Sequence, residues 1–91
     1  MAGIRFDAAE AIVKIGIIKA SGNKPNKGVD NGNQLGELGI VDEPTLDALR
    51  EEIVQGTFAY HYRIEPAVLN LTTGLKVYEV IDQVIDNAIR L

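Results

Sequence analysis

The chain has 91 residues and a net charge of -4; hydrophobic residues make up 46% of it, and it contains no cysteine. This length allows one domain with one modest core, so we expect a single domain over residues 1–91, and the composition is that of a folded globular domain. The acidic charge disfavours nucleic acid and anionic membrane surfaces as partners, and the lack of cysteine excludes disulfides and thiolate chemistry.

The N-terminal stretch does not have the pattern of a secretory signal, because Lys14 and Lys19 interrupt its apolar residues. No run approaches the roughly 20 apolar residues that span a bilayer. We therefore expect a cytoplasmic protein that does not insert into membranes.

The first predicted helix covers residues 7–19, where apolar residues recur at steps of three and four. Asp7 is suited to its N-cap and Gly22 to its end. Residues 22–36 are rich in Gly and Asn, which predicts a long flexible loop. No Gly-Lys-Ser/Thr sequence follows these glycines, so they do not indicate a phosphate site.

The second predicted helix begins near Asp42, has Pro44 in its first turn and ends at Gly56. Its buried stripe consists of Leu46, Leu49 and Ile53. The opposite face is mostly acidic and consists of Glu43, Asp47, Arg50, Glu51 and Glu52. This face is a candidate for partner docking, and a solvated helix surface is the simpler alternative.

Residues 57–64 alternate with period two, which is a strand signal. A lone strand has no partner, so we expect an extended connector that places its aromatic residues in the helical core. Residues 66–71 are expected to form one short helical turn, and Thr72 or Thr73 to cap a last helix through Arg90. Short helices that follow one another in sequence predict an all-α fold, a small four-helix bundle.

This order of elements, with two short motifs, resembles the acyl carrier protein family, including the peptidyl carrier domains. The more specific motif is Glu37-Leu38-Gly39-Ile40-Val41-Asp42, and the weaker one is Leu71-Thr72-Thr73-Gly74-Leu75. The resemblance implies a four-helix bundle of acyl-carrier-protein-like type, with a long loop between helices 1 and 2. It also implies that the acidic second helix docks on basic patches of partner enzymes.

In that family a serine after the Asp carries a 4'-phosphopantetheine arm. Glu43 occupies this position here, or Thr45 if two residues are inserted. The only serine, Ser21, lies on the other side of the loop. A carboxylate cannot form the phosphodiester bond that a hydroxyl forms, so no cofactor is expected, unless the protein is a genuine carrier with its arm on an atypical residue such as Thr45.

No residue pattern indicates catalysis or metal binding. His61 is the only histidine and has no partner signature for acid–base chemistry, and no Asp/Glu spacing is typical of a calcium loop. We therefore expect a non-catalytic protein that docks on or regulates enzymes of fatty-acid, polyketide or peptide-type biosynthesis. The alternatives are the genuine carrier described above and a small helical adaptor or oligomerisation module unrelated to carriers.

Overall fold

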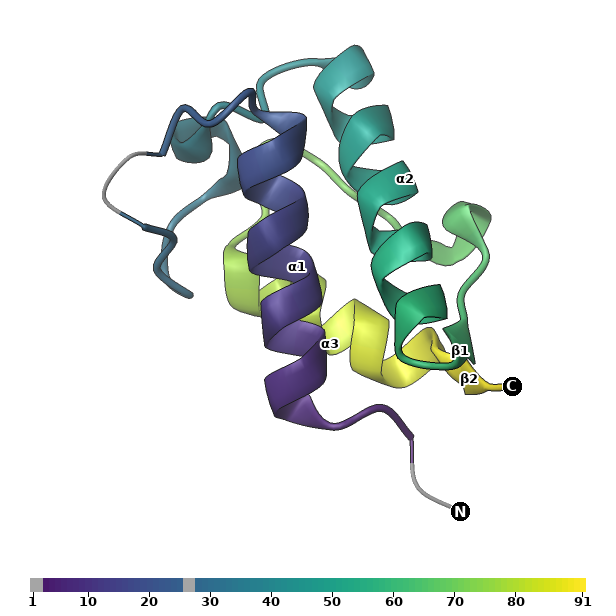
Figure 1. Cartoon of the computed structure of the whole chain (residues 1–91). Coiled ribbons are helices and arrows are strands. Elements are labelled where there is room, and N and C mark those ends of the chain that lie inside the picture. Colours follow the sequence, from purple (N-terminus) through teal and green to yellow (C-terminus); the bar gives the residue numbers. More distant parts are fainter. Residues whose placement is uncertain (1–2, 26–27) are drawn as a thin grey trace.

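The structure is a computed structural model that describes residues 3–25 and 28–91. Three α-helices, two short 3-10 helices and two short strands make up this part of the chain (Figure 1). In chain order they are α1 (Phe6–Ala20), η1 (Leu35–Leu38), α2 (Glu43–Ala59), β1 (Tyr62–Arg63), η2 (Pro66–Val68), α3 (Val77–Asn87) and β2 (Ile89–Arg90).

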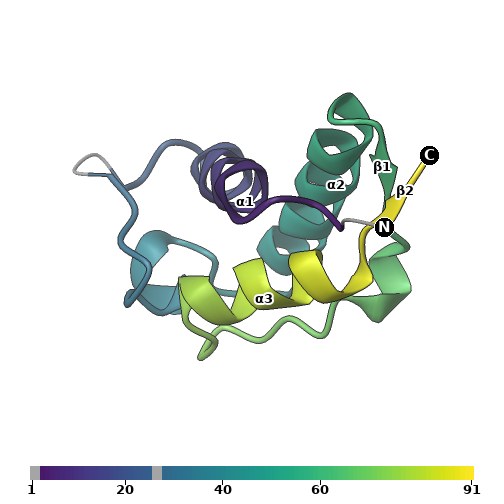
Figure 2. The ribbon, with the colours of Figure 1, turned by 90° about the horizontal axis from the view of Figure 1, so that it is seen from below.

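α1 is the central element, because it packs against both α2 and α3. α3 runs across the α1–α2 pair rather than alongside it (Figure 2). One core lies between the three helices and the segments that connect them. Its fully buried large side chains are Ile17, Leu35, Ile40, Leu49, Ile53, Leu69, Ile81, Val13, Val77, Val80 and Val84.

α1 and α2 approach closely at two glycines. A Cβ at Gly56 would lie 2.7 Å from Cγ2 of Ile12, and a Cβ at Gly16 would lie 3.2 Å from Cβ of Glu52. We predicted that Gly56 ends the second helix, which is wrong, since α2 continues to Ala59. Glycine is needed at this position for the contact between the helices and not for a turn.

The prediction of a four-helix bundle is wrong for the described part of the chain, which has three α-helices and a two-stranded sheet. Pro66 starts only a three-residue 3-10 helix, and the backbone at Leu69 is already extended. The extended course buries Leu69 and Leu71 in the core. A fourth helix would lift one of these two side chains out of the core, since residues two apart lie on different faces of a helix.

The two strands connect segments that are distant in sequence. Tyr62 pairs with Arg90 and Arg63 with Ile89 in an antiparallel ladder. The last helix was predicted to continue through Arg90, but α3 ends at Asn87 because the residues after it serve as the partner strand. The connector that we expected to lack a partner is therefore paired.

Two aromatic side chains that we expected in the core lie at the surface. Phe58 is 66% exposed and Tyr60 is 47% exposed, whereas Tyr62 is half-buried. The cause is that residues 57–59 belong to α2, so a helical period places Phe58 on the outer face. The alternation that predicted an extended segment holds only from Tyr62 onward.

The end of the Gly/Asn-rich loop is tied to the start of α3. Backbone N–H groups of Leu35 and Gly36 donate to Leu75 O and Thr73 O, both at 2.8 Å. In the other direction, Val77 N–H donates to Asn33 O at 2.9 Å. Residues 26 and 27 of the loop lie outside the described residues.

The helix starts agree only in part with their predictions. Asp42 is the N-cap of α2, which confirms the prediction. Arg5 precedes α1 as N-cap and Asp7 lies in the first turn, and α3 begins after Lys76 and not at Thr72 or Thr73. The local sequence at 72–76 favours a cap, but the backbone bonds to the loop and a turn in which Leu75 N–H donates to Thr72 O at 3.2 Å keep these residues out of α3.

The end of α1 at Gly22 is confirmed, since α1 stops at Ala20 and Gly22 has a left-handed φ of 70°. Among the helices of the described residues, none combines the length and apolar character required to cross a bilayer.

We expect Gly56→Ala to lower the free energy of unfolding by up to about 2 kcal/mol. Overpacking against Ile12 costs about 1–3 kcal/mol, and alanine recovers roughly 1 kcal/mol of this through its better helix propensity. Urea denaturation measures the change, with Gln55→Ala, an exposed substitution on the same helix, as the control. A more stable Gly56→Ala variant would contradict a close approach of α1 and α2.

His61 ends the turn after α2 in a left-handed conformation with φ of 67°, which costs about 1 kcal/mol for a residue with a Cβ. Its own N–H donates to Phe58 O, and its carbonyl accepts from Leu91 N–H at 2.9 Å. We therefore expect His61→Gly to raise the free energy of unfolding, by up to about 1 kcal/mol. His61→Ala keeps the strained geometry and should not stabilise; equal stability of the two variants in urea would disprove the strain.

Candidate functional site

The start of α2 is closed by reciprocal hydrogen bonds between Asp42 and Thr45. Thr45 N–H donates to Asp42 Oδ1 at 3.1 Å, and Thr45 Oγ1 accepts from the N–H groups of Val41 and Asp42 at 3.0 and 3.1 Å. The Thr45 hydroxyl also donates to the Asp42 carboxylate at 2.7 Å. These bonds satisfy backbone donors that a helix start otherwise leaves free, and they occupy the Thr45 hydroxyl.

The three residues considered for a phosphopantetheine arm lie in different settings. Glu43 is exposed at the first position of α2 and offers only a carboxylate. Thr45 is half-buried and bonded to Asp42 as described. Ser21 is buried and donates to Ile18 O at 3.1 Å. The Ser21 hydroxyl is thus hydrogen-bonded at the end of α1, and the Thr45 hydroxyl at the start of α2.

The five residues predicted for partner docking do not share one face. Glu43, Asp47 and Glu51 are exposed and lie four residues apart, so they form one row along α2. We call these three residues the acidic row. Glu43 and Glu51 make no ion pair among the described residues.

Arg50 and Glu52 do not belong to the acidic row, since Arg50 lies on its flank and Glu52 faces α1. Arg50 Nε donates to Leu69 O at 3.2 Å, and its NH1 lies 2.7 Å from Asp47 Oδ1. Arg50 therefore fastens α2 to the segment after η2 and neutralises part of the charge of Asp47. Glu52 is half-buried beside Gly16, in a groove between α1 and α2 that Lys19 also lines.

Phe58, which was not predicted as a site residue, extends the outer face of α2 beyond the acidic row. It borders a groove of about 230 Å³ whose walls are mainly apolar. The groove is lined by Val54, Gln55, Phe58, Tyr62, Arg63 and Ile64. Glu51, Val54 and Phe58 follow one another at helical spacing, which indicates that they share one face of α2. The alternation in residues 57–64 predicted burial of Phe58 instead.

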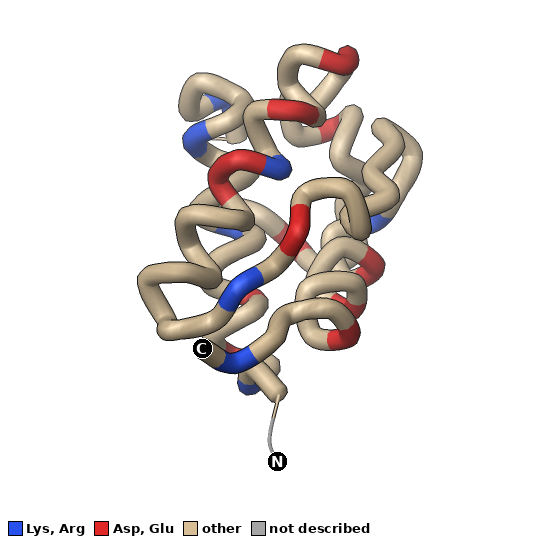
Figure 3. The backbone as a smooth tube through the Cα atoms, turned by 90° about the vertical axis from the view of Figure 1, so that its right-hand side faces the viewer, with Lys and Arg blue, Asp and Glu red and all other residues tan. Residues whose placement is uncertain are grey.

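Basic residues lie beside this groove at the β1–β2 end. Each strand contains one arginine, Arg63 and Arg90, and Arg63 pairs with Glu65 at 3.3 Å. In Figure 3 the tube is blue beside the C-terminus, while red positions lie along the helices of this side. The acidic row thus makes the outer side of α2 negative, whereas at the β1–β2 end the charge of Arg63 is balanced by Glu65.

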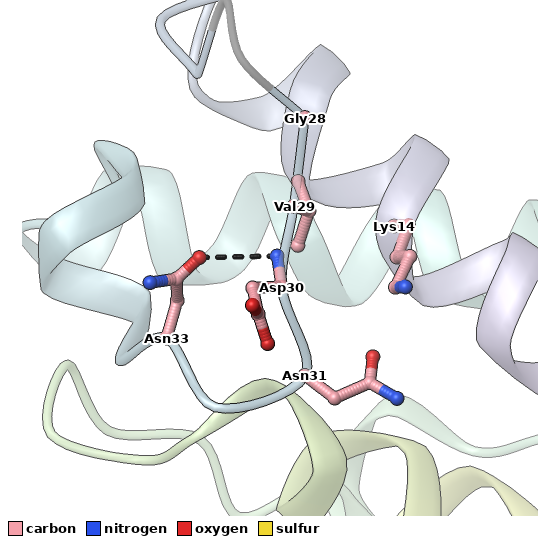
Figure 4. Close-up of a pocket in the computed structure, with 6 residues that line it drawn as sticks. All are labelled: Lys14, Gly28, Val29, Asp30, Asn31 and Asn33. Carbon is pink, nitrogen blue, oxygen red and sulfur yellow. Dashed lines mark hydrogen bonds between the residues drawn. The ribbon is translucent and has the colours of Figure 1, made fainter.

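A second, polar hollow of about 590 Å³ lies between the loop and α1 (Figure 4). Asn31 Nδ2 donates to Glu10 Oε2 at 3.0 Å, and Lys14 Nζ lies 3.3 Å from the same oxygen. Asp30 N–H donates to Asn33 Oδ1 at 3.0 Å. These contacts shape the turn that presents Asn31 and Asn33 to α3.

No metal-binding cluster is evident in residues 3–25 and 28–91. No group of three or more His, Cys, Asp or Glu side chains is placed to hold a metal ion there. The His61 side chain is exposed and has no hydrogen-bond partner in the same ranges. Comparison with models of known protein families, with curated proteins and with solved structures returned no match.

Two carboxyl groups have lowered pKa values because they accept hydrogen bonds in the folded state. The Thr45 hydroxyl, followed by the Thr45 N–H, lowers the pKa of Asp42 below its ordinary 3.8. The Asn31 amide, followed by the Lys14 ammonium, lowers the pKa of Glu10 below its ordinary 4.5. Their stabilising effect is fully present above these ordinary values, and it is lost as the pH falls through the folded-state pKa values.

We therefore expect the urea midpoint to fall as the pH decreases below about 4.5, since the unfolded chain binds these protons first. The Glu10→Gln, Asp42→Asn variant should show a shallower decline. Asp82→Asn, Asp86→Asn removes two exposed carboxylates that make no hydrogen bond among the described residues, and is the matched control. Equal slopes for the two double variants would show that the hydrogen bonds of Glu10 and Asp42 do not set the acid sensitivity.

Proposed function

We propose that the protein is a non-catalytic, carrier-like docking or regulatory domain that acts without a phosphopantetheine arm. It binds a basic patch on a partner enzyme of fatty-acid, polyketide or peptide-type biosynthesis, in the cytoplasm. The observation that carries the proposal is the acidic row, Glu43, Asp47 and Glu51, three exposed carboxylates in line on α2. The resemblance of residues 37–42 to the segment before the second helix of carrier proteins suggests the class of partner.

Electrostatics supports a basic partner. Glu43 and Glu51 have no neutralising cation among the described residues, so an incoming Lys or Arg gains their interaction without displacing an existing ion pair. Exposed charges of this kind accelerate association and select partners by sign, and their effect weakens as salt increases. The net charge of -4 acts in the same direction over longer distances.

The bonds of Thr45 support the absence of an arm. A transferase needs the hydroxyl free and turned outward, whereas the Thr45 hydroxyl accepts two N–H groups and donates to Asp42. Modification of the Thr45 hydroxyl would break the hydrogen bonds that cap the start of α2. Glu43, at the alternative position, has no hydroxyl to modify.

Two charge-reversal variants test the docking site at equal net charge. Glu43→Lys with Glu51→Lys, and Asp82→Lys with Asp86→Lys on α3, each raise the net charge by 4, from -4 to 0. We expect the α2 pair to abolish salt-sensitive binding to a purified partner enzyme, and the α3 pair to reduce it much less. Equal losses would mean that net charge, and not the acidic row, drives binding.

Intact-mass spectrometry of the protein isolated from its own host tests the missing arm. We expect the mass of the polypeptide without a pantetheine-type addition. An addition that maps to Thr45 would overturn the proposal and identify a genuine carrier.

A further inference from the structure

We propose that the groove beside Phe58 takes an apolar anchor residue of a basic, amphipathic helix whose cationic residues lie over the acidic row. This inference deepens the proposed docking function and rests on it. It assigns a second contact to the partner, which the charge of α2 alone does not predict. We call this cleft the Phe58 groove; it is lined by Val54, Gln55, Phe58, Tyr62, Arg63 and Ile64.

The walls of the Phe58 groove suit an apolar side chain. Ile64 is buried at its base and Val54 is half-buried, while Phe58 stands 66% exposed at the rim. Tyr62 is held in place by its hydroxyl, which donates to Gly3 O at 3.2 Å. When a partner side chain enters the cleft, the exposed ring of Phe58 loses contact with water, which favours binding. Aromatic residues that become buried at an interface often contribute most of the binding energy.

The volume of the groove argues for a side chain and not for a free small ligand. About 230 Å³ lies below the roughly 300–1,000 Å³ typical of small-molecule pockets. The groove also offers few polar groups to orient a ligand, since Arg63 is already paired with Glu65. An anchor that belongs to a larger partner does not need such groups, because the charges along α2 orient it.

Charge complementarity defines the chemistry of the occupant. Glu51 and Glu43, the two carboxylates of the acidic row that make no ion pair among the described residues, precede Phe58 on α2 by seven and fifteen residues. At a rise of about 1.5 Å per residue, these carboxylates lie roughly 10 and 22 Å along the helix from Phe58. A partner helix beside α2 matches this spacing with an apolar anchor followed by Lys or Arg about seven and fifteen positions away.

The experiment uses the full chain and a synthetic helical peptide with one Leu anchor and Lys residues seven and fifteen positions from it. Binding is followed by NMR of the Val54 and Ile64 methyl groups. We expect Phe58→Ala to weaken peptide binding about tenfold or more, because it removes an aromatic wall of the groove that contacts the Leu anchor. Ile89→Ala removes an apolar residue of the same 66% exposure outside the groove and should leave affinity unchanged.

The results separate this inference from the proposed function. If the Glu43→Lys, Glu51→Lys variant loses the peptide but Phe58→Ala does not, the acidic row docks partners and the anchor groove is disproved. If Phe58→Ala loses the peptide but a Lys-to-Gln peptide binds as tightly as the original, the groove stands and the acidic docking function fails. Concentration-dependent self-association that perturbs the Val54 and Ile64 methyl groups, without peptide binding, would overturn the proposed occupant in favour of a second copy of the chain.

Discussion

The structure depends on the close contact of α1 and α2 at Gly16 and Gly56. The α-carbon of Gly56 faces Ile12 at a distance that leaves no room for a methyl group. α1 also packs against α3, so the helix that makes this contact touches both other helices of the core. The two helices gain dispersion contacts along their facing surfaces that a bulkier residue at either glycine would prevent.

This contact also decides which residues of α2 reach solvent. With Leu49, Ile53 and Gly56 directed toward the core and α1, the outer face must carry Glu43, Asp47, Glu51 and Phe58. Arg50, on the flank between the two faces, bonds to the carbonyl of Leu69 and restrains the helix against the extended segment after η2. The proposed docking surface is therefore the side of α2 that the core leaves uncovered.

Contacts between distant segments replace the fourth helix that the local sequence suggested. The end of the Gly/Asn-rich loop bonds to residues 73–78, and β1 bonds to β2 at the C-terminal end of the described chain. The first set holds the loop against the turn before α3 and the first residues of α3, and the second set pairs two short strands. In a chain of 91 residues, they allow Leu69 and Leu71 to complete the core without another helix.

Local spacing and capping chemistry were enough to predict the three principal helices, the Asp42 cap of α2 and the buried stripe from Leu46 to Ile53. The pairing of β1 with β2 and the helical interior position of Gly56 could not be predicted in this way, because each depends on a partner far away in sequence, the C-terminal strand for β1 and Ile12 of α1 for Gly56. The exposure of Phe58 was also missed, because it follows from the continuation of α2 past Gly56. The same limit applies to the site: charge spacing identified Glu43, Asp47 and Glu51, but only the packed core showed that Arg50 and Glu52 serve other contacts.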